Sequence, residues 1–361
     1  MVLQLAMELP FLSYAALFIV SFLIVRTVIS IRNRSKLPPG PTALPVIGHL
    51  HLLNPFIHQT FQKLSSIHSA LMYLRLGSVE CVVVSNPELA KELLKHHELT
   101  FSARKHTAAI DHLTYNSSFA FAPYGTYWKF IKKLSTFELL GNRTLGQFLP
   151  ATDTTAIAVE WALAELINNP ETLRKAQQEL DQVVGTSRLV QEFDTQRLPY
   201  LQAIIKESFR LHPPIPMISR KAVEDCKING YTIPAQSLLF VNIWAIGRDP
   251  KVWEDPLKFQ PERFSKCNRP DTNINSGDID VKGLHYQLLP FGTGRRGCPG
   301  ISLAMQELPV TLAALIQCFD WKLPNVGSGV DMSERAGLTA PRAHDLKCVP
   351  LARFTPTLFA T

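Results

Sequence analysis

A glycine-rich run with one cysteine carries the most specific chemistry in the sequence. It reads Phe291-Gly292-Thr293-Gly294-Arg295-Arg296-Gly297-Cys298-Pro299-Gly300, and a helical pattern begins directly after it. Glycines let a loop approach a flat ligand closely, and a cysteine just before a helix has its thiolate favoured by the helix dipole and by free backbone N–H groups. The run predicts a thiolate ligand for iron, and such ligation favours O–O cleavage. The alternative is a glycine-rich loop with an incidental buried cysteine.

Two other groups of residues could take part in chemistry. Asp153 and Thr154 place a carboxylate beside an alcohol, a pair that can relay a proton, although both residues could instead cap a helix. Glu207 and Arg210 are three residues apart in a predicted helix, so they share one face. A second arginine, Arg263, follows later in the chain. Glu207 with Arg210, or Arg263 with its neighbour Glu262, would alone suggest a surface ion pair.

The elements that must position these residues are mainly helices. Apolar spacing and stop signals predict helices over 151–167, 171–184 and 198–211, and another that opens at Ile301. A further helix is expected over 127–140 and one after Asn86-Pro87, while strands are expected in a hairpin over 71–85, near 228–233 and over 237–243. The fold class expected is mostly α with small β-sheets.

The start of the sequence predicts a membrane anchor at 1–31, because Leu9 to Val25 is apolar enough to span a bilayer. Basic residues follow this segment and only Glu8 precedes it, which places the body of the protein in the cytoplasm. A cleaved signal peptide is the alternative. The proline-rich stretch 32–42 then forms a stiff linker.

Charge and cysteine usage narrow the class of partner. The formal net charge of +7 suits an anionic membrane face and an acidic protein partner. Lys and Arg are dispersed without a recognised binding motif, so we expect no nucleic-acid partner. The six cysteines form no C-x-x-C pair, so neither a zinc ribbon nor a dithiol redox motif is indicated.

The glycine-rich run matches the heme-binding signature F-x-x-G-x-R-x-C-x-G at Phe291, Gly294, Arg296, Cys298 and Gly300. In this respect the chain resembles the cytochrome P-450 superfamily. The resemblance implies the fold of that superfamily, a heme b whose axial iron ligand is Cys298, dioxygen as co-substrate, and electrons from NADPH delivered by a reductase. It also implies a single-pass protein of the endoplasmic reticulum membrane.

The same resemblance assigns roles to the other residues. Glu207, Arg210 and Arg263, the last in Pro261-Glu262-Arg263-Phe264, correspond to a buried network behind the heme, and Asp153 with Thr154 to the oxygen-activation pair. The residues assigned to the heme propionates are Trp128, Lys132, Arg220 and Arg296. Lysine at position 132 departs from the usual arginine and gives a point charge in place of a planar fork.

Longer stretches resemble the flavonoid-acting plant branch, in particular membrane-bound flavone synthase or flavanone 2-hydroxylase. They include LPVIGHLHLL, FAPYGTYWKF, ATDTT, HPPIPMISRKAVEDC, NIWAIGRDP and GLTAPRA. The implied substrate is a flavanone, a small apolar molecule that is oxidised to a flavone or a 2-hydroxyflavanone. The resemblance places 106–119, 151–155, 214–219 and 338–340 on the substrate side.

The match breaks at Pro150. Members of the superfamily run to about 500 residues, so this chain of 361 lacks roughly 150. The gap falls between an N-terminal portion at 43–149 and a C-terminal heme-binding portion at 150–361. Proline cannot continue a helix toward its N-terminus, so the helix with Asp153 must begin here.

An incomplete fold follows from this junction. We expect apolar surface that faces water or repacks, and weak or absent turnover. Three functions stay open: a flavanone monooxygenase, a membrane-anchored truncated variant with little or no activity, and a heme-thiolate isomerase or dehydratase that needs no reductase.

Overall fold

The computed structural model describes residues 36–115, 117–140, 153–265, 279–324 and 329–353, together with Tyr14, Leu17, Phe18 and Ser21. The predicted anchor at 1–31 lies almost wholly outside these residues, and so does the junction at Pro150. Within the described ranges one helix, Ile301–Cys318, is long and apolar enough to cross a bilayer by length and composition. It packs in the core through Leu312 and Ile316, which are fully buried.

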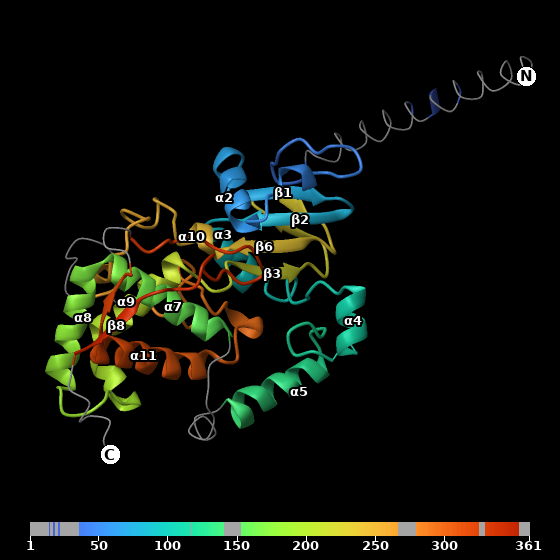
Figure 1. The fold of residues 1–361 in the computed structure, drawn as a ribbon. Helices are drawn as coiled ribbons and strands as arrows, with labels where there is room; N and C mark the ends of the chain where they lie inside the picture. Colours follow the sequence, from blue (N-terminus) through green and yellow to red (C-terminus); the bar gives the residue numbers. More distant parts are fainter. Residues whose placement is uncertain are drawn as a thin grey trace, which may run out of the picture.

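A four-stranded sheet carries residues from both sides of the predicted junction (Figure 1). β1 (Leu71–Leu76) and β2 (Val79–Val84) form the expected hairpin, and Gly77 turns between them with a φ of +63°. β2 pairs in parallel with β6 (Leu238–Asn242), and β6 pairs antiparallel with β3 (Met217–Lys221). The strand order is therefore β1-β2-β6-β3.

Alternation of side chains along β2 divides the core around the sheet. Val82 and Val84 belong to one buried cluster, whereas Cys81 and Val83 belong to another on the opposite face. The helix α2 (Ile57–Ile67) covers the second face.

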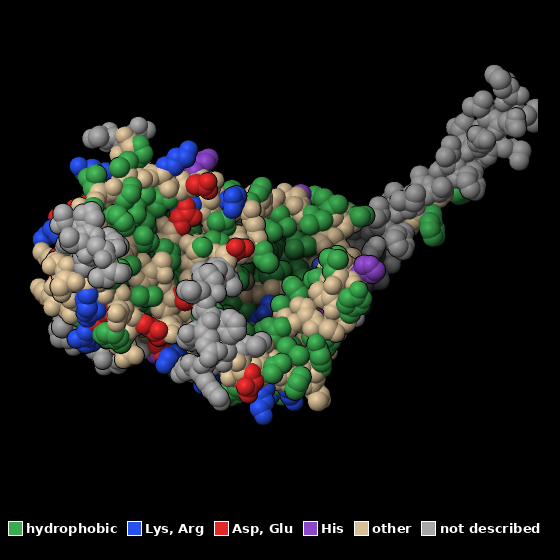
Figure 2. All heavy atoms as spheres, turned by 60° about the horizontal axis from the view of Figure 1, so that its bottom comes forward, with side chains coloured by type: hydrophobic (Ala, Val, Ile, Leu, Met, Phe, Trp, Pro, Cys, Tyr) green, Lys and Arg blue, Asp and Glu red, His purple; other side chains and the backbone are tan. Residues whose placement is uncertain are grey.

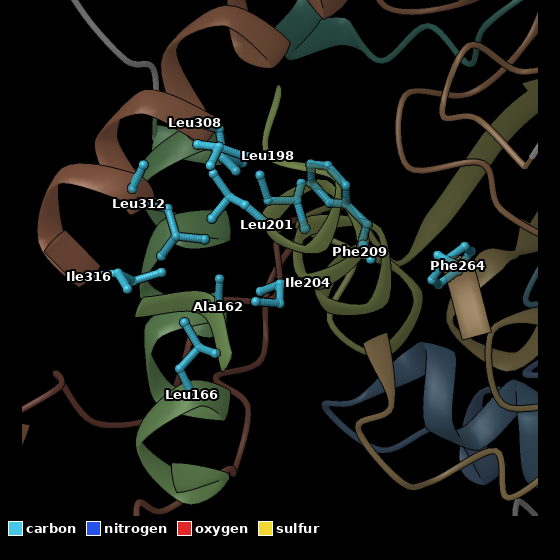
Figure 3. Close-up of a cluster of buried hydrophobic side chains, with 14 of the residues drawn as sticks. Ala162, Leu166, Leu198, Leu201, Ile204, Phe209, Phe264, Leu308, Leu312 and Ile316 are labelled. Atoms are coloured by element: carbon cyan, nitrogen blue, oxygen red, sulfur yellow. The ribbon is translucent and has the colours of Figure 1, made fainter. Parts of the chain in front are cut away.

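A bundle of four helices forms the other part of the molecule (Figure 1). Its members are α7 (Asp153–Asn168), α8 (Pro170–Val183), α9 (Pro199–Leu211) and α11 (Ile301–Cys318). Side chains from three of these helices point toward one another in Figure 3, among them Ala162, Leu166, Leu201, Ile204, Leu308, Leu312 and Ile316. The predicted stop at Gly185 is confirmed by its φ of +81°. The sequence therefore located these helices to within a few residues.

The remaining elements are short. The helix α3 (Pro87–Lys91) begins as predicted, because the side chain of Asn86 accepts the N–H of Leu89 at 3.1 Å. The others are η1 (Leu50–Leu52), η2 (Glu92–His96), α4 (Ala108–Thr114), α5 (Thr126–Leu134), η3 (Ser135–Leu139), η4 (Glu192–Arg197), β4 (Cys226–Ile228), β5 (Tyr231–Ile233), α10 (Ile243–Ile246), η5 (Pro261–Phe264), η7 (Gly294–Arg296), β7 (Phe319–Lys322) and β8 (Val349–Ala352). The expected strand region at 228–233 is thus a hairpin of β4 and β5.

One face of α5 and of the turn after it is apolar and open to water. Tyr127, Phe130, Leu134 and Phe137 recur at helical spacing and are 48%, 60%, 39% and 67% exposed. In Figure 1 this helix lies at the edge of the molecule, apart from the bundle. Apolar surface near the junction was expected either to face water or to repack. On α5 it faces water.

Candidate active site

The loop that carries Cys298 is folded by its own backbone. The N–H of Cys298 donates to the carbonyl of Phe291 at 2.9 Å, which closes the loop. Gly292 and Gly294 adopt φ values of +69° and +66°, conformations that favour glycine. Because α11 starts at Ile301, the cysteine stands just ahead of a helix N-terminus, as predicted.

The thiol of Cys298 is exposed to a cavity, and its pKa lies above the usual value for cysteine. Burial among the cavity walls raises its pKa, while a hydrogen bond from the N–H of Gly300 and the charge of Lys132 lower the pKa by less. The predicted effect of the helix terminus is present, because the N–H of Gly300 lowers the pKa, while desolvation acts in the opposite direction. A cation placed beside the sulfur would reverse this balance.

The cavity has a volume of about 490 Å³ and separates the cysteine loop from α7. Its floor includes Gly297, Cys298 and Gly300, and Thr154 and Thr155 of α7 also line it. The rest is mainly apolar, with Phe209, Pro214, Ile215, Met217, Ile218 and Leu303 among its walls. Figure 2 shows this side of the molecule hollowed between its two parts, with hydrophobic side chains on both sides of the hollow. The size is within the range of small-molecule and cofactor sites.

Three arginines line one end of this cavity, Arg104, Arg220 and Arg296, and a fourth cation, Lys132, lies next to it, where it donates to the carbonyl of the lining residue Gly297. Burial lowers the pKa of each, and repulsion from neighbouring cations lowers it further at Lys132, Arg220 and Arg296, the last to about 10. Arg104 Nε and Arg296 Nη1 are buried without a hydrogen-bond partner among the described residues. Buried, mutually repelling cations with unused donors form a site for an anion.

Arg104 was missed by the sequence reasoning. It donates from Nη1 to the carbonyl of Ser219 at 2.7 Å, next to Arg220, and a bridge between Ala103 and Lys221 brings the two segments together. The residues are more than 100 positions apart, and no local pattern marks this pairing.

Trp128 lies in the site but does not offer its N–H to it. Its indole donates to the carbonyl of Phe119 at 3.0 Å, and the guanidinium of Arg296 lies 4.3 Å from the centre of its ring. Its role here is to support Arg296 through a cation–π contact. Lys132 is oriented by the carbonyl groups of Arg295 and Gly297.

The predicted relay pair is only half within the cavity. Thr154 lines it, whereas Asp153 stands exposed in the first turn of α7. A different carboxylate is present: Glu307 of α11 lines the cavity, and its Oε2 is buried without a partner among the described residues. Glu307 is three residues after Ala304 and four after Leu303, so helical spacing alone would have placed all three on one face of the helix and predicted Glu307 as a residue of the site.

Glu207, Arg210 and Arg263 come together in the predicted buried network. Arg210 donates to both carboxylate oxygens of Glu207 at 2.7 Å, and Arg263 donates from Nε at 3.0 Å. The side chains of Glu207 and Arg210 are completely buried and that of Arg263 is 4% exposed. The network joins α9 to η5.

Comparison with known proteins identifies the family. The cytochrome P450 family model matches residues 38–150 and 142–348, which is most of the chain. The chain belongs to the cytochrome P450 family. By family, the chain is therefore an oxidoreductase of the monooxygenase class. Members of the P450 family hold heme through a cysteine thiolate.

Plant P450 proteins are among its relatives. Cytochrome P450 93B2 of Gerbera hybrida is 42% identical over 89% of this chain and 93% of its own length. The 3,9-dihydroxypterocarpan 6A-monooxygenase of Glycine max is 36% identical over 90% of this chain and 95% of its own. The 2-hydroxyisoflavanone synthase of Glycine max is 35% identical, with coverages of 88% and 92%. These names connect the chain to the flavonoid-related P450 proteins.

The P450 fold is also found among solved structures. A zebra fish cytochrome P450 determined with abiraterone superposes with a TM-score of 0.68 at 22% identity, over 82% of this chain and 100% of that chain. This likeness supports the fold alone.

The comparisons also agree with an internal deletion. The two segments matched by the P450 model meet at 142–150, next to the predicted junction. The alignment with the Gerbera hybrida protein runs over 485 positions, whereas the whole chain has 361, so at least 124 positions of that alignment face a gap in this chain.

The residues at the cavity fit a heme group. Heme is a flat macrocycle with two carboxylates on one edge, and the cavity offers a thiol, glycines in its floor, apolar walls and three arginines at one end, with Lys132 beside them. The unused donors of Arg104 and Arg296 match the acceptors that propionates bring.

Proposed function

We propose that this P450 protein binds heme b through the Sγ of Cys298 and oxidises a flavanone. The observation that carries the proposal is a single cavity lined by the exposed thiol of Cys298, the alcohol of Thr154 and three arginines, Arg104, Arg220 and Arg296. When bound, heme supplies the oxygen-activating chemistry of the family.

The cation cluster would hold the two propionates. Arg104, Lys132, Arg220 and Arg296 repel one another, Glu98 offsets this repulsion only in part, and two propionate charges would relieve it further. Trp128 supports this arrangement through the ring of its indole beneath Arg296. Phe291, Gly294 and Gly300 shape the loop that would present Cys298 to the macrocycle.

Thr154 and Asp153 would deliver protons from the side of the cavity opposite Cys298. The hydroxyl of Thr154 can pass a proton into the cavity, and Asp153, exposed one residue earlier, can take up a proton from water. The Glu207, Arg210 and Arg263 network holds α9 and η5 together beneath this site.

A flavanone is proposed as substrate because the walls of the cavity are apolar and two relatives are named as a 3,9-dihydroxypterocarpan 6A-monooxygenase and a 2-hydroxyisoflavanone synthase. Ile215, Met217 and Ile218 would contact its rings. The product would be a flavone or a 2-hydroxyflavanone. Electrons from NADPH would arrive through a reductase, on the cytoplasmic face of the endoplasmic reticulum membrane to which the segment 1–31 would anchor the chain.

A second candidate function is a truncated variant with little or no turnover. The gap of at least 124 aligned positions and the exposed apolar face of α5 both favour it. Water that reaches the cavity weakens the electrostatic effects on which catalysis depends. This second candidate predicts heme binding with weak or absent turnover.

The test is expression of the full chain in microsomes with a plant reductase. We expect bound heme and a reduced, CO-bound spectrum with the red-shifted Soret band of thiolate ligation. Cys298→Ser should abolish that band, whereas Cys318→Ser, which changes another free cysteine, should keep it. Failure of the wild-type chain to retain heme would refute the proposed heme site. Heme retention without NADPH-dependent oxidation of the flavanone naringenin would select the truncated variant.

A further inference from the structure

Trp161 of α7 lies behind the cavity wall and makes no contact with the cavity itself. Its side chain is 1% exposed, and its indole stacks on the ring of His212 with centroids 4.0 Å apart and an interplanar angle of 5°. His212 in turn bonds through Nε2 to Glu165 Oε1 at 2.7 Å, one helical turn beyond Trp161. α7 therefore holds His212 by a stack and by a hydrogen bond.

The indole N–H of Trp161 reaches a second segment. It donates to the carbonyl of Ala340 at 2.9 Å, and the N–H of Ala340 donates to the carbonyl of Pro214 at 2.9 Å. Ala340 is only 4% exposed, although Leu338, two residues earlier, is 83% exposed. A single buried side chain thus fixes the inner end of an exposed loop.

Both contacts converge on one stretch of chain. His212 and Pro214 stand immediately before Ile215, Met217 and Ile218, which form a wall of the cavity. The stack sets the position of His212, and the two hydrogen bonds through Ala340 set the position of Pro214. Met217 and Ile218 are also held by the pairing of β3 with β6, so loss of either contact loosens the N-terminal end of the wall, at Pro214 and Ile215.

We propose that Trp161 is a positioning residue that fixes the N-terminal end of the cavity wall 214–218 and thereby sets which substrates fit. The part of this inference that concerns substrate rests on the proposed function. Because Trp161 acts through His212 and Ala340, its effect appears in the fit of a bulky ligand and not in the ligation of iron.

The alternative is that Trp161 only fills space in the core. The two possibilities differ in the role of the indole N–H. This group contributes little to packing, but it donates the hydrogen bond to Ala340, which a phenylalanine side chain cannot make. Trp161→Phe keeps an aromatic ring against His212 and removes this donor. Trp321→Phe is the matched control, because the indole of Trp321 also donates to a backbone carbonyl, that of Leu315 at 3.2 Å, but on β7.

The first measurement is amide hydrogen exchange of the full chain. Peptides that cover 338–343 and 212–218 should exchange about ten-fold faster in Trp161→Phe, because a buried carbonyl loses its donor and the segment opens more often. Trp321→Phe should leave both peptides unchanged. Exchange of these peptides at the wild-type rate in Trp161→Phe would overturn the positioning role, whether or not the chain binds heme.

The second measurement is ligand binding to the ferric protein, followed by the shift of the Soret band. Trp161→Phe should bind naringenin several-fold more weakly and imidazole, which is small and bonds to the iron, with unchanged affinity. Equal losses for both ligands, or none for naringenin, would overturn the role in substrate fit. A wild-type chain without heme would refute the proposed function and leave the exchange result to decide the positioning role.

Discussion

Replacement of Arg210 by methionine tests the buried network most directly. The substitution keeps the approximate length of the side chain but leaves the carboxylate of Glu207 with Arg263 and the N–H of Gln260 as its remaining partners. It also removes the donor for the carbonyl groups of Gly247, Pro256 and Lys258. Removal of one partner of a buried ion pair typically costs about 3–5 kcal/mol, a large part of the stability of an ordinary domain.

Arg263→Met should cost less, about 2–3 kcal/mol, because Glu207 keeps both bonds from Arg210, although the carbonyl of Glu254 and the side chain of Gln260 also lose their bond from Arg263. The assay is urea unfolding followed by circular dichroism. Arg174→Met is the control: Arg174 pairs with Glu171 on an exposed face, and we expect no measurable change there. A cost for Arg263→Met equal to or above that for Arg210→Met would contradict this account of the network.

Three further predictions follow from the cavity, from a buried carboxylate and from the exposed helix. Arg104→Gln should speed heme loss about ten-fold by removal of a charge-assisted bond to a propionate, as measured by heme transfer to apomyoglobin, whereas the exposed Lys105→Gln should not. Burial raises the pKa of Glu334, but bonds from His58 and Trp244 lower it more, to about 2, below its usual 4.5. The stability from this depressed pKa is present above about pH 4.5 and is lost as the pH falls toward 2, so Glu334→Gln should cost up to about 3 kcal/mol at pH 6 and progressively less in acid. A difference in free energy of unfolding between wild type and Glu334→Gln that stays constant from pH 6 to 3 would contradict this role of Glu334. Phe130→Lys should reduce concentration-dependent association in sedimentation velocity without loss of heme, because the side chain is 60% exposed, and unchanged association would show that this face is inert.

Local signals in the sequence were sufficient for the elements and for the glycine-rich loop. Asn86 and Gly77 act through their own backbone neighbourhood, and the turn and cap that they predicted are present. Glu207 and Arg210 could be paired because helical spacing brings them to one face.

What the sequence did not predict depends on contacts between distant segments. Arg104 enters the cavity because a bridge aligns Ala103 with Lys221, and the N–H of Trp128 is taken by Phe119. The pKa of Cys298 is raised because walls from several elements exclude water, an effect that no local pattern records.

The parallel pairing of β2 with β6 bears on how this chain can fold at all. These strands come from opposite sides of the junction, so their pairing closes a large loop of chain. Loop-closure entropy depends only on the logarithm of length, and removal of the 124 or more aligned positions from the connection changes it by about 0.5 kcal/mol. The sheet is thus nearly indifferent to the deletion in entropic terms. The two strands can still pair. The cost of the shortened chain lies instead in exposed apolar surface, such as that of α5, which lowers solubility.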